Sequence, residues 1–394
     1  MPINYAQVQS SLQNFTQKVR RHQDDLKQAQ DSLWQKLADR SNEVNSIRQR
    51  VEEASRLAIN TFCAKPVSEP LLFHKGLPGL PGRYTLIAAD GSQIAPNRHK
   101  AIEYCVINVG LISAEMGSAK EPDFEIQSDL LDYDRLITPQ GFLIGEQEVS
   151  LLRDLAERRA LLSFAAQRQG PVIAMTDGLL DIYQRLEGPQ QNLNLQQELL
   201  AMHRCMQSQQ MINLGYIDKP GSELLSRLFD ILERSDEQLS AYSDKDRTLR
   251  GVSDAHLLTR LLQTPGERSA VFEVVNQSRG KTRPALQVHF FYLNVGEPES
   301  PYLARVEFPA WVSANPQQVD LLHAAVYRDT QVFEGHPYPY LLLRAHELAI
   351  INFAEHEEVE AMLHQKFAEE GMPLTQVSHK QFGKNNLNRS GHAG

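Results

Sequence analysis

The segment Tyr84-Thr-Leu-Ile-Ala-Ala-Asp-Gly-Ser92 decides the fold of this chain. Its first six residues form a short apolar run, typical of a strand buried in a sheet, and the run ends in Asp90-Gly91. The same pattern returns at Val172-Ile-Ala-Met-Thr176, which leads into Asp177-Gly178. In α/β proteins the ends of strands carry the sites, and a glycine there permits a sharp turn or a close backbone approach to a ligand. If the two strands are neighbours, the two aspartates are predicted to lie close together.

The elements around these two strands alternate between strands and helices, which is the pattern of an α/β fold. A second strand is expected at residues 101–112, followed by a polar, acidic surface loop at residues 115–136. Helical periodicity marks residues 146–167 and about 195–214. The final third is expected to contain a helix at 255–262, strands at 270–275, 286–293 and 304–308, an Arg/Lys-rich turn at 279–283, and a helix that opens at 337–340.

An amphipathic helical arm is expected at the N-terminus. From about residue 7 to 59 there is neither proline nor glycine, and apolar residues recur at steps of three and four. The arm either packs on the rest of the chain or forms a helical hairpin used for oligomerisation or partner binding. Four prolines and three glycines between residues 65 and 82 then indicate a linker.

The composition is that of a soluble globular protein, with 394 residues, 41% hydrophobic residues, 23% charged residues and a net charge of −9. It excludes a chain that is disordered as a whole and one that binds nucleic acid through a large net positive charge. Three widely separated cysteines form no disulfide or zinc pattern, which indicates a reducing compartment. Because the sequence has neither a signal-peptide pattern nor a long apolar run, we expect a cytoplasmic protein that does not enter a membrane.

Two carboxylates at one edge of a sheet repel each other unless a cation lies between them, and hard oxygen ligands of this kind suit Mg²⁺ or Mn²⁺. The structural alternative is a pair of ordinary turns, because Asp-Gly is also a common turn dipeptide. A third carboxylate is expected on the helix before the second strand, where Glu146, Glu148, Asp154 and Glu157 all lie. Arg153 and Glu157 would share a face one turn apart, but spacing alone does not separate Glu157 from the other acids.

Lys219 and His346 are further candidates for chemistry. Lys219 precedes Pro220 in an expected turn, where a lysine can stabilise the charge of a phosphate. His346 lies near the start of a predicted helix, and a histidine can orient or deprotonate a water molecule. Taken alone, each is more simply a surface lysine or a histidine satisfied at a helix surface. The sequence contains no phosphate-binding P-loop, dinucleotide-binding, nucleophile-elbow or zinc-protease motif.

Six short motifs follow one another along most of the chain. They are Ile87-Ala-Ala-Asp90-Gly-Ser92, Arg153-x-x-x-Glu157, Met175-Thr-Asp177-Gly-Leu-Leu180, Gly215-Tyr216-Ile-Asp-Lys219, Asp254-x-x-Leu-Leu followed by Pro265-Gly-Glu-Arg268-Ser, and Tyr338-Pro-Tyr-x-Leu-x-Arg-Ala-His346. In this order and context the chain resembles the NurA nuclease family. The resemblance implies an RNase H-like mixed-sheet core and an Mn²⁺-dependent nuclease that acts on DNA. It also implies a homodimer whose subunits enclose a DNA channel, and a partner, the hexameric HerA-type translocase ATPase.

The resemblance also assigns the metal-binding carboxylates, position by position. Asp90, Glu157 and Asp177 correspond to the three carboxylates of the family. The match of Glu157 depends on the Arg-x-x-x-Glu pattern, and Glu148 is its rival.

Three further positions match catalytic positions of the family. Lys219 corresponds to the conserved basic group, His346 to the C-terminal catalytic histidine, and Tyr216 to a polar or aromatic position before the lysine. Asp218 departs from the serine that many members carry before the lysine, which leaves the role of Lys219 open.

The predicted function is that of a metal-dependent DNA nuclease of the 5′-3′ exonuclease and single-strand endonuclease type, using Mn²⁺ or Mg²⁺. It would act on single-stranded DNA and double-stranded ends, with a HerA-type translocase, in the resection of DNA double-strand breaks. The alternative is a non-catalytic adaptor that dimerises, docks on a hexameric ATPase and guides DNA. A third possibility is an unrelated metal-dependent phosphoesterase that acts on small molecules.

The predicted organisation is a helical arm at residues 1–64, a linker at 65–83, a NurA nuclease domain at 84–372 and a disordered tail at 373–394. The negative charge is concentrated, because residues 115–157 contain eleven acidic and three basic side chains, a net charge of −8. Local phosphate contacts decide DNA binding, so this acidity does not exclude a DNA partner. It favours an enclosed DNA track with a few placed cations and predicts weak DNA affinity for the protein alone.

Overall fold

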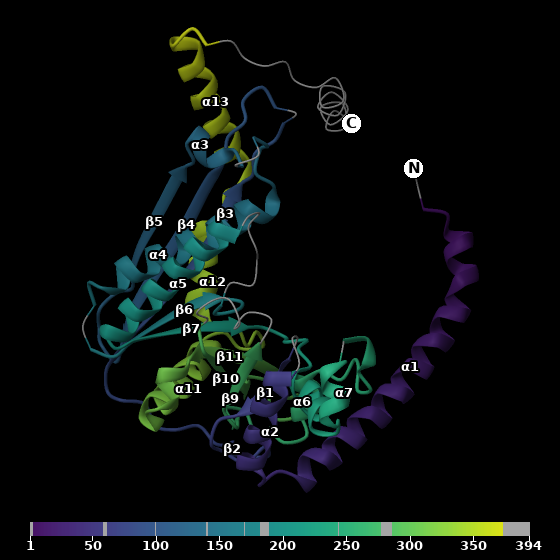
Figure 1. Ribbon diagram of the computed structural model, residues 1–394. Helices are drawn as coiled ribbons and strands as arrows, with labels where there is room; N and C mark the ends of the chain where they lie inside the picture. The colour runs from purple at the N-terminus through teal and green to yellow at the C-terminus, as the bar shows by residue number, and fades with distance from the viewer. Residues whose placement is uncertain are drawn as a thin grey trace. The chain divides into compact units, whose positions relative to one another are not determined.

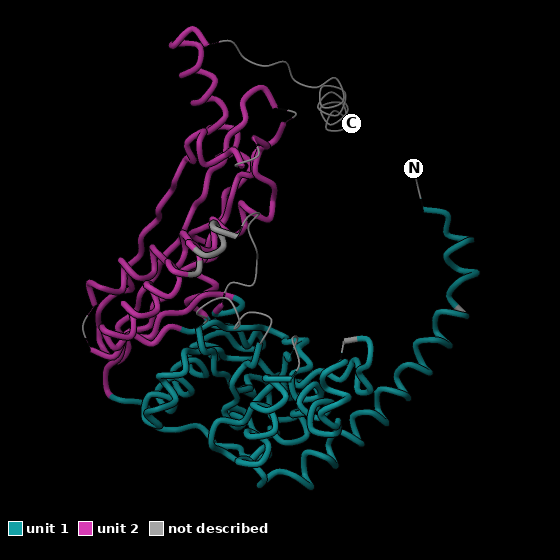
Figure 2. The backbone as a smooth tube through the Cα atoms, viewed as in Figure 1, with its two compact units in different colours: residues 1–81, 178–180, 214–339 teal, residues 82–177, 181–213, 340–394 magenta. Residues whose placement is uncertain are grey.

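The computed structural model describes residues 3–57, 61–98, 100–138, 141–168, 170–181, 189–242, 244–276 and 286–372 (Figure 1). The predicted tail at 373–394 and the basic turn at 279–283 lie outside these described residues. The chain forms two compact units, each assembled from segments that are far apart in the sequence (Figure 2). The first unit consists of residues 1–81, 178–180 and 214–339, and the second of residues 82–177, 181–213 and 340–394.

The first unit is built on antiparallel strands in the order β1-β9-β10-β11-β7, with β2 and β8 attached to β10. These strands are β1 (Phe62–Pro66), β2 (His74–Lys75), β7 (Met211–Ile217), β8 (Arg268–Ser269), β9 (Phe272–Asn276), β10 (Val288–Asn294) and β11 (Leu303–Pro309). Its helices are α1 (Tyr5–Asp39), α2 (Val44–Leu57), α6 (Leu224–Leu232), α7 (Asp236–Ser240), α8 (Asp254–Leu258), α10 (Ala310–Ser313) and α11 (Pro316–Thr330), with a short 3-10 helix at Asp244–Asp246. Residues 214–217 of β7 belong to this unit.

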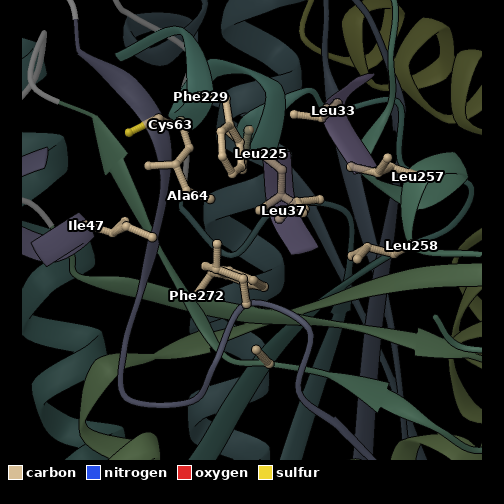
Figure 3. Packing of buried hydrophobic residues seen from close by; sticks show 14 of the residues in the cluster. Leu33, Leu37, Ile47, Cys63, Ala64, Leu225, Phe229, Leu257, Leu258 and Phe272 are labelled. Carbon is tan, nitrogen blue, oxygen red and sulfur yellow. The ribbon is translucent and has the colours of Figure 1, made fainter. Parts of the chain in front are cut away.

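Within the first unit, α2 and the C-terminal half of α1 are packed against other elements. Leu33 and Leu37 of α1 are fully buried, and Ile47 of α2 joins them in one core with Leu225 and Phe229 of α6 (Figure 3). Full burial of such a side chain contributes about 1.5–3 kcal/mol. Further towards the N-terminus the apolar stripe of α1 is exposed, from Tyr5 to Val19. The C-terminal half of α1 and the helix α2 are thus part of the core of this unit.

β1 begins at Phe62, within the expected helical arm, and the proline-rich segment expected to be a linker holds the end of β1 and the whole of β2. Ala64 pairs with Val274, and Pro66 pairs with Phe272. Proline removes a backbone donor, but β1 lies at the edge of the sheet, where one side of the strand has no ladder to complete. The proline and glycine count therefore did not distinguish a linker from an irregular edge of the sheet.

The second unit contains strands in the order β6-β3-β4-β5, and residues 211–213 of β7 lie next to β6. β3 (Tyr84–Ile94) is antiparallel to β4 (Val106–Met116) and parallel to β6 (Val172–Asp177), while β4 is antiparallel to β5 (Asp123–Leu130). In chain order the five strands are arranged 3-2-1-4-5 with the second strand reversed, which is the arrangement of an RNase H-like core. The expected fold class, an RNase H-like mixed sheet with an N-terminal helical segment, is confirmed.

Helices cover both faces of this sheet. They are α3 (Tyr133–Leu136), α4 (Glu146–Ala165), α5 (Pro189–Ser208), α12 (Tyr340–Ala349) and α13 (Phe353–Glu369). Ile87 and Ala89 of β3 belong to the same apolar cluster as Val149 of α4. Ser92 donates its hydroxyl to the backbone carbonyl of Ala349 in α12, at 2.5 Å. Because successive side chains of a strand alternate between faces, β3 presents its odd positions to α4 and its even positions to α12.

Two expected elements of the second unit are wrong. The segment at 115–136, expected to be a loop, holds the end of β4, the whole of β5 and α3. β5 alternates acidic and apolar side chains, and Phe124 and Ile126 are both more than half exposed, so it lacks the apolar run of a buried strand. The helix expected to continue to residue 214 ends at Ser208, and β7 begins at Met211.

Two further features of the described residues bear on the expected cellular location, namely their helices and their cysteines. None of their helices combines the length and the apolar character needed to cross a bilayer. Cys63, Cys105 and Cys205 are free thiols.

Three buried histidines make stability depend on pH. Burial lowers the pKa of His203, His289 and His323 to about 4, so each is neutral in the folded protein at pH 5 and largely protonated when unfolded. The contribution of the three neutral histidines to the free energy of unfolding is complete above about pH 6.5 and is lost as the pH falls towards 4. Burial raises the pKa of Asp254 to about 6 and that of Glu157 to about 8, and these two shifts act in the opposite direction, so together they offset about two of the three histidines. We expect urea unfolding to show a free energy that is lower at pH 5 than at pH 7 by about 1–2 kcal/mol in total.

His323→Gln provides the control for this pH dependence. His323 is fully buried, and its Nε2 lies 2.6 Å from the carbonyl oxygen of Gly266. Glutamine can donate the same hydrogen bond but has no group that binds a proton in this pH range. The variant should show a smaller difference between the two pH values. An equal free energy of unfolding at pH 5 and pH 7 in the unsubstituted protein would contradict the prediction.

Candidate active site

Asp90 lies inside a strand and not at its end. β3 continues through Asp90, Gly91 and Ser92, and its pairing with β4 extends to Ile94 opposite Val106. The expected end of the strand at Ala89 is therefore wrong, because the Asp-Gly pair makes no turn here. The carboxylate of Asp90 is nevertheless accessible, with 21% of its side chain exposed.

Gly91 is required by the approach of α4 and not by a turn. A Cβ atom at this position would lie 2.7 Å from Cγ of Arg153 and 2.7 Å from Oε1 of Glu157. A side chain here would displace Arg153 or Glu157, so the glycine lets both come directly against the strand. Gly91 thus provides the space in which the carboxylate of Glu157 lies against β3.

Asp177 is placed next to Asp90 by the strand register. β3 and β6 are parallel, and the last paired residues are Ala89 and Thr176. Asp90 and Asp177 follow immediately on neighbouring strands, and partners in register point to the same face of a sheet. Asp177 ends β6 and is exposed, and Gly178 after it adopts a left-handed backbone with φ +83°. The expected adjacency of the two strands is present, and at Asp177 the strand does end.

His346 contacts Asp90 directly. Its Nδ1 lies 2.6 Å from Oδ2 of Asp90, and 58% of its side chain is exposed. The histidine reaches Asp90 because α12 packs closely on β4, where a Cβ on Gly110 would lie 2.5 Å from the carbonyl oxygen of Ala345. Gly110 is also the residue paired with Asp90 in the β3–β4 ladder. Sequence analysis did not predict that Gly110 supports this contact, and the only local signal for it is a glycine within a strand.

Glu157 and its rival Glu148 lie in different surroundings on α4. Glu148 accepts a hydrogen bond from the backbone N–H of Gly145 at 3.0 Å, which caps the start of the helix. Glu157 is only 6% exposed, and burial raises its pKa to about 8, with repulsion from Asp154 and Asp90 adding to the shift. Of these two acids, Glu157 is the one that comes against β3, where its Oε1 would lie 2.7 Å from a Cβ on Gly91, the residue after Asp90.

Tyr216 lies in β7 and Lys219 follows this strand, and both belong to the first unit. The ring of Tyr216 is fully buried and stacks edge-to-face on Tyr338, with centroids 5.6 Å apart. Its backbone carbonyl accepts a hydrogen bond from Gly178 at 2.7 Å. Lys219 is exposed and has a left-handed backbone with φ +44°, which is uncommon for a residue with a side chain. The roles of these two residues in catalysis stay predictions.

The donor chemistry around Asp90 fits a hard divalent cation. Asp90, Glu157 and Asp177 offer oxygen ligands, and Glu157 is a buried carboxylate whose ion pair with Arg153 is not aligned as a hydrogen bond. A buried carboxylate gains from a nearby cation, because an uncompensated charge is costly away from water. The described residues contain no group of three acidic, histidine or cysteine side chains already arranged around one point. The side chains that suit a metal are present, and their convergence on one ion stays a prediction.

The chain is similar to one known protein family and to several solved structures. The family model described as the NurA domain matches residues 84–351. A crystal structure of the NurA nuclease from Sulfolobus solfataricus has a TM-score of 0.47 and 12% identity, covering 86% of this chain and 98% of that chain. The catalytic domain of human endonuclease V gives a TM-score of 0.32 and 13% identity, covering 82% and 98%, respectively.

A third similar structure, LC9-RNase H1, has a TM-score of 0.23 and 13% identity and covers 45% of this chain and 81% of that chain. No match to a curated protein was found. The family match covers more than half of the chain and includes Asp90, Glu157, Asp177 and His346. The chain therefore belongs to the NurA family.

Proposed function

We propose that this protein is a divalent-metal-dependent DNA nuclease that uses Mn²⁺, with Mg²⁺ as a possible substitute. The observation that carries the proposal is the contact of 2.6 Å between His346 and Asp90, with Asp177 next in register and the buried Glu157 against the following residue, Gly91. A structural ion pair would not need two further carboxylates beside it. Membership of the NurA family supports the same reaction, because a solved structure of a family member is described as a nuclease.

Each residue of the site would have a separate role in phosphodiester hydrolysis. Asp90, Glu157 and Asp177 would hold the metal, which supplies Lewis-acid stabilisation of the phosphate and of the departing oxygen. Asp90 also fixes the imidazole of His346 through Nδ1 and leaves Nε2 for the substrate. From there His346 can position the attacking water or deliver a proton to the leaving oxygen. Its exposed ring can reach a DNA strand, which a buried histidine could not.

Lys219 is proposed to offset the negative charge of the phosphate during cleavage. Its exposed side chain in a turn after β7 is suited to a flexible polyanion. Tyr216 is proposed to support that turn from the core, since its own side chain is fully buried. We further propose, from the family resemblance, that the protein acts as a homodimer with a HerA-type hexameric ATPase in DNA end resection, with 5′-3′ exonuclease and single-strand endonuclease activity.

A metal titration with labelled DNA tests the nuclease proposal. We expect cleavage of an end-labelled single-stranded oligonucleotide that rises with Mn²⁺ concentration and is abolished by a chelator, and slower cleavage of a blunt duplex. An excess of long unlabelled DNA should suppress the reaction, whereas small phosphodiesters should not. Binding of DNA without cleavage at every metal concentration would instead identify the protein as an adaptor that guides DNA.

A further inference from the structure

Arg153 brings a positive charge into the group of carboxylates around Asp90. Its Nε lies 3.3 Å from Oε1 of Glu157, and its Nη2 lies 3.1 Å from Oδ1 of Asp154. Burial lowers the pKa of Arg153, but the attraction of Glu157, Asp154 and Asp90 outweighs burial and leaves the pKa above its ordinary value. The guanidinium is therefore stabilised by the same carboxylates that suit a metal.

The contact between Arg153 and Glu157 balances their charges, but it is not an aligned hydrogen bond that would orient the carboxylate of Glu157. Nε of Arg153 is buried and makes no hydrogen bond, although it lies within ion-pair distance of Glu157. The hydrogen bonds of this guanidinium go to Asp154, and at 3.5 Å to Ser150, both on the same helix. Arg153 is thus held by other residues of α4 while its charge faces Glu157. An arginine that oriented the carboxylate would instead form a direct, aligned pair.

The strand next to Arg153 is shaped to receive it. The side-chain stem of Arg153 passes over Gly91, where Cγ would lie 2.7 Å and Cδ 3.1 Å from any added Cβ. No side chain at position 91 leaves room for this path, so the glycine admits Arg153 together with Glu157. The placement of the positive charge is therefore built into both β3 and α4.

We propose that Arg153 is a resident counter-ion of Glu157, with which a divalent cation must compete for this carboxylate. This inference rests on the proposed function, because it takes the carboxylates to be metal ligands. Arg153 attracts one negative charge on Glu157 but repels both positive charges of the metal. Removal of the arginine charge therefore tightens metal binding, and it destabilises the protein without metal because the carboxylates then repel each other.

Calorimetric titration of the full-length chain with Mn²⁺ alone tests this proposal. Arg153→Gln removes the charge, and Arg153→Met provides a second neutral variant that fills the same space. We expect about tenfold tighter Mn²⁺ binding in both, and binding like that of the unsubstituted protein in Arg153→Lys. Without metal, both neutral variants should melt at a lower temperature, and Mn²⁺ should raise their melting temperature by more than it raises that of the unsubstituted protein.

The matched control is Arg159→Gln, which removes a half-exposed arginine on the same helix that pairs with Glu198. Its Mn²⁺ affinity should be unchanged. If both neutral variants at Arg153 bind Mn²⁺ with unchanged or weaker affinity while the unsubstituted protein binds it, Arg153 is not a competitor, and the proposed function stands. If neither the unsubstituted protein nor any variant binds Mn²⁺, both proposals are wrong.

Discussion

Replacement of Asp90 by asparagine should abolish Mn²⁺-dependent DNA cleavage, with a loss of about three orders of magnitude in rate. Asparagine keeps the volume of the side chain and an oxygen that can still accept a hydrogen bond from His346. It removes the negative charge that a divalent cation needs. Asp177→Asn should have a similar effect, because Asp177 follows next to Asp90 in the parallel register. Cleavage rates on a labelled oligonucleotide at saturating Mn²⁺ measure both variants.

The control for these substitutions is Asp129→Asn on β5. Asp129 is an exposed acid that pairs with Arg135 at 2.8 Å, and its loss removes the same charge elsewhere in the second unit. Circular dichroism and melting temperature should be nearly unchanged in Asp90→Asn, because the side chain is partly exposed. Undiminished cleavage by both Asp90→Asn and Asp177→Asn would overturn the assignment of these carboxylates.

Replacement of Gly110 by alanine should impair stability and activity together. The new Cβ would lie 2.5 Å from the carbonyl oxygen of Ala345 and 2.7 Å from the backbone nitrogen of Ala349. Both are backbone atoms of α12, so the whole helix must shift and no side-chain rotation can relieve the contact. Overpacking of this kind costs about 1–3 kcal/mol. Urea unfolding should show this loss.

The activity effect of Gly110→Ala follows from the position of His346 on the displaced helix. The end of α12 is anchored by Asn108, which donates to the carbonyl of Ala349 at 2.8 Å, so a shift there moves the histidine relative to Asp90. Cleavage should fall by more than the folded fraction of the protein explains. Gly82→Ala is the control, because nothing lies within 4 Å of an added Cβ at that position. Unfolding and cleavage like those of the Gly82 variant would show that α12 tolerates the methyl group.

The apolar runs before Asp90 and Asp177 allowed the centre of the fold to be predicted. Buried parallel strands have a strong local signal, since every residue of the run is apolar, and both runs are strands of the sheet. The helix at 146–167 was also apparent from its periodicity, and the structure has α4 at Glu146–Ala165. The expected pairing of the two strands depended on their similarity and on the family resemblance, because no local pattern specifies which strands are neighbours.

Close approach between elements could not be predicted from the sequence. Gly91 was interpreted as part of a turn because Asp-Gly is common there, whereas it serves the contact between β3 and α4. The choice between Glu148 and Glu157 was open, because both lie on one helix at spacings that local rules do not separate. Only the packing of α4 on the strand places Glu157 against Gly91 and leaves Glu148 as a cap. β5 was missed because its apolar residues are exposed and alternate with acids.

The acidic residues of β5 have a consequence for how copies of this protein meet. Among the described strands, β5 pairs with β4 and has an open outer edge. One of its faces exposes Phe124, Ile126 and Leu130, a combination that invites edge-to-edge association with another molecule. Glu125 and Asp129 alternate with these residues along the strand, and like charges on two such edges repel. The negative charges of this segment therefore oppose aggregation through the outer edge of β5, with which no other described strand pairs.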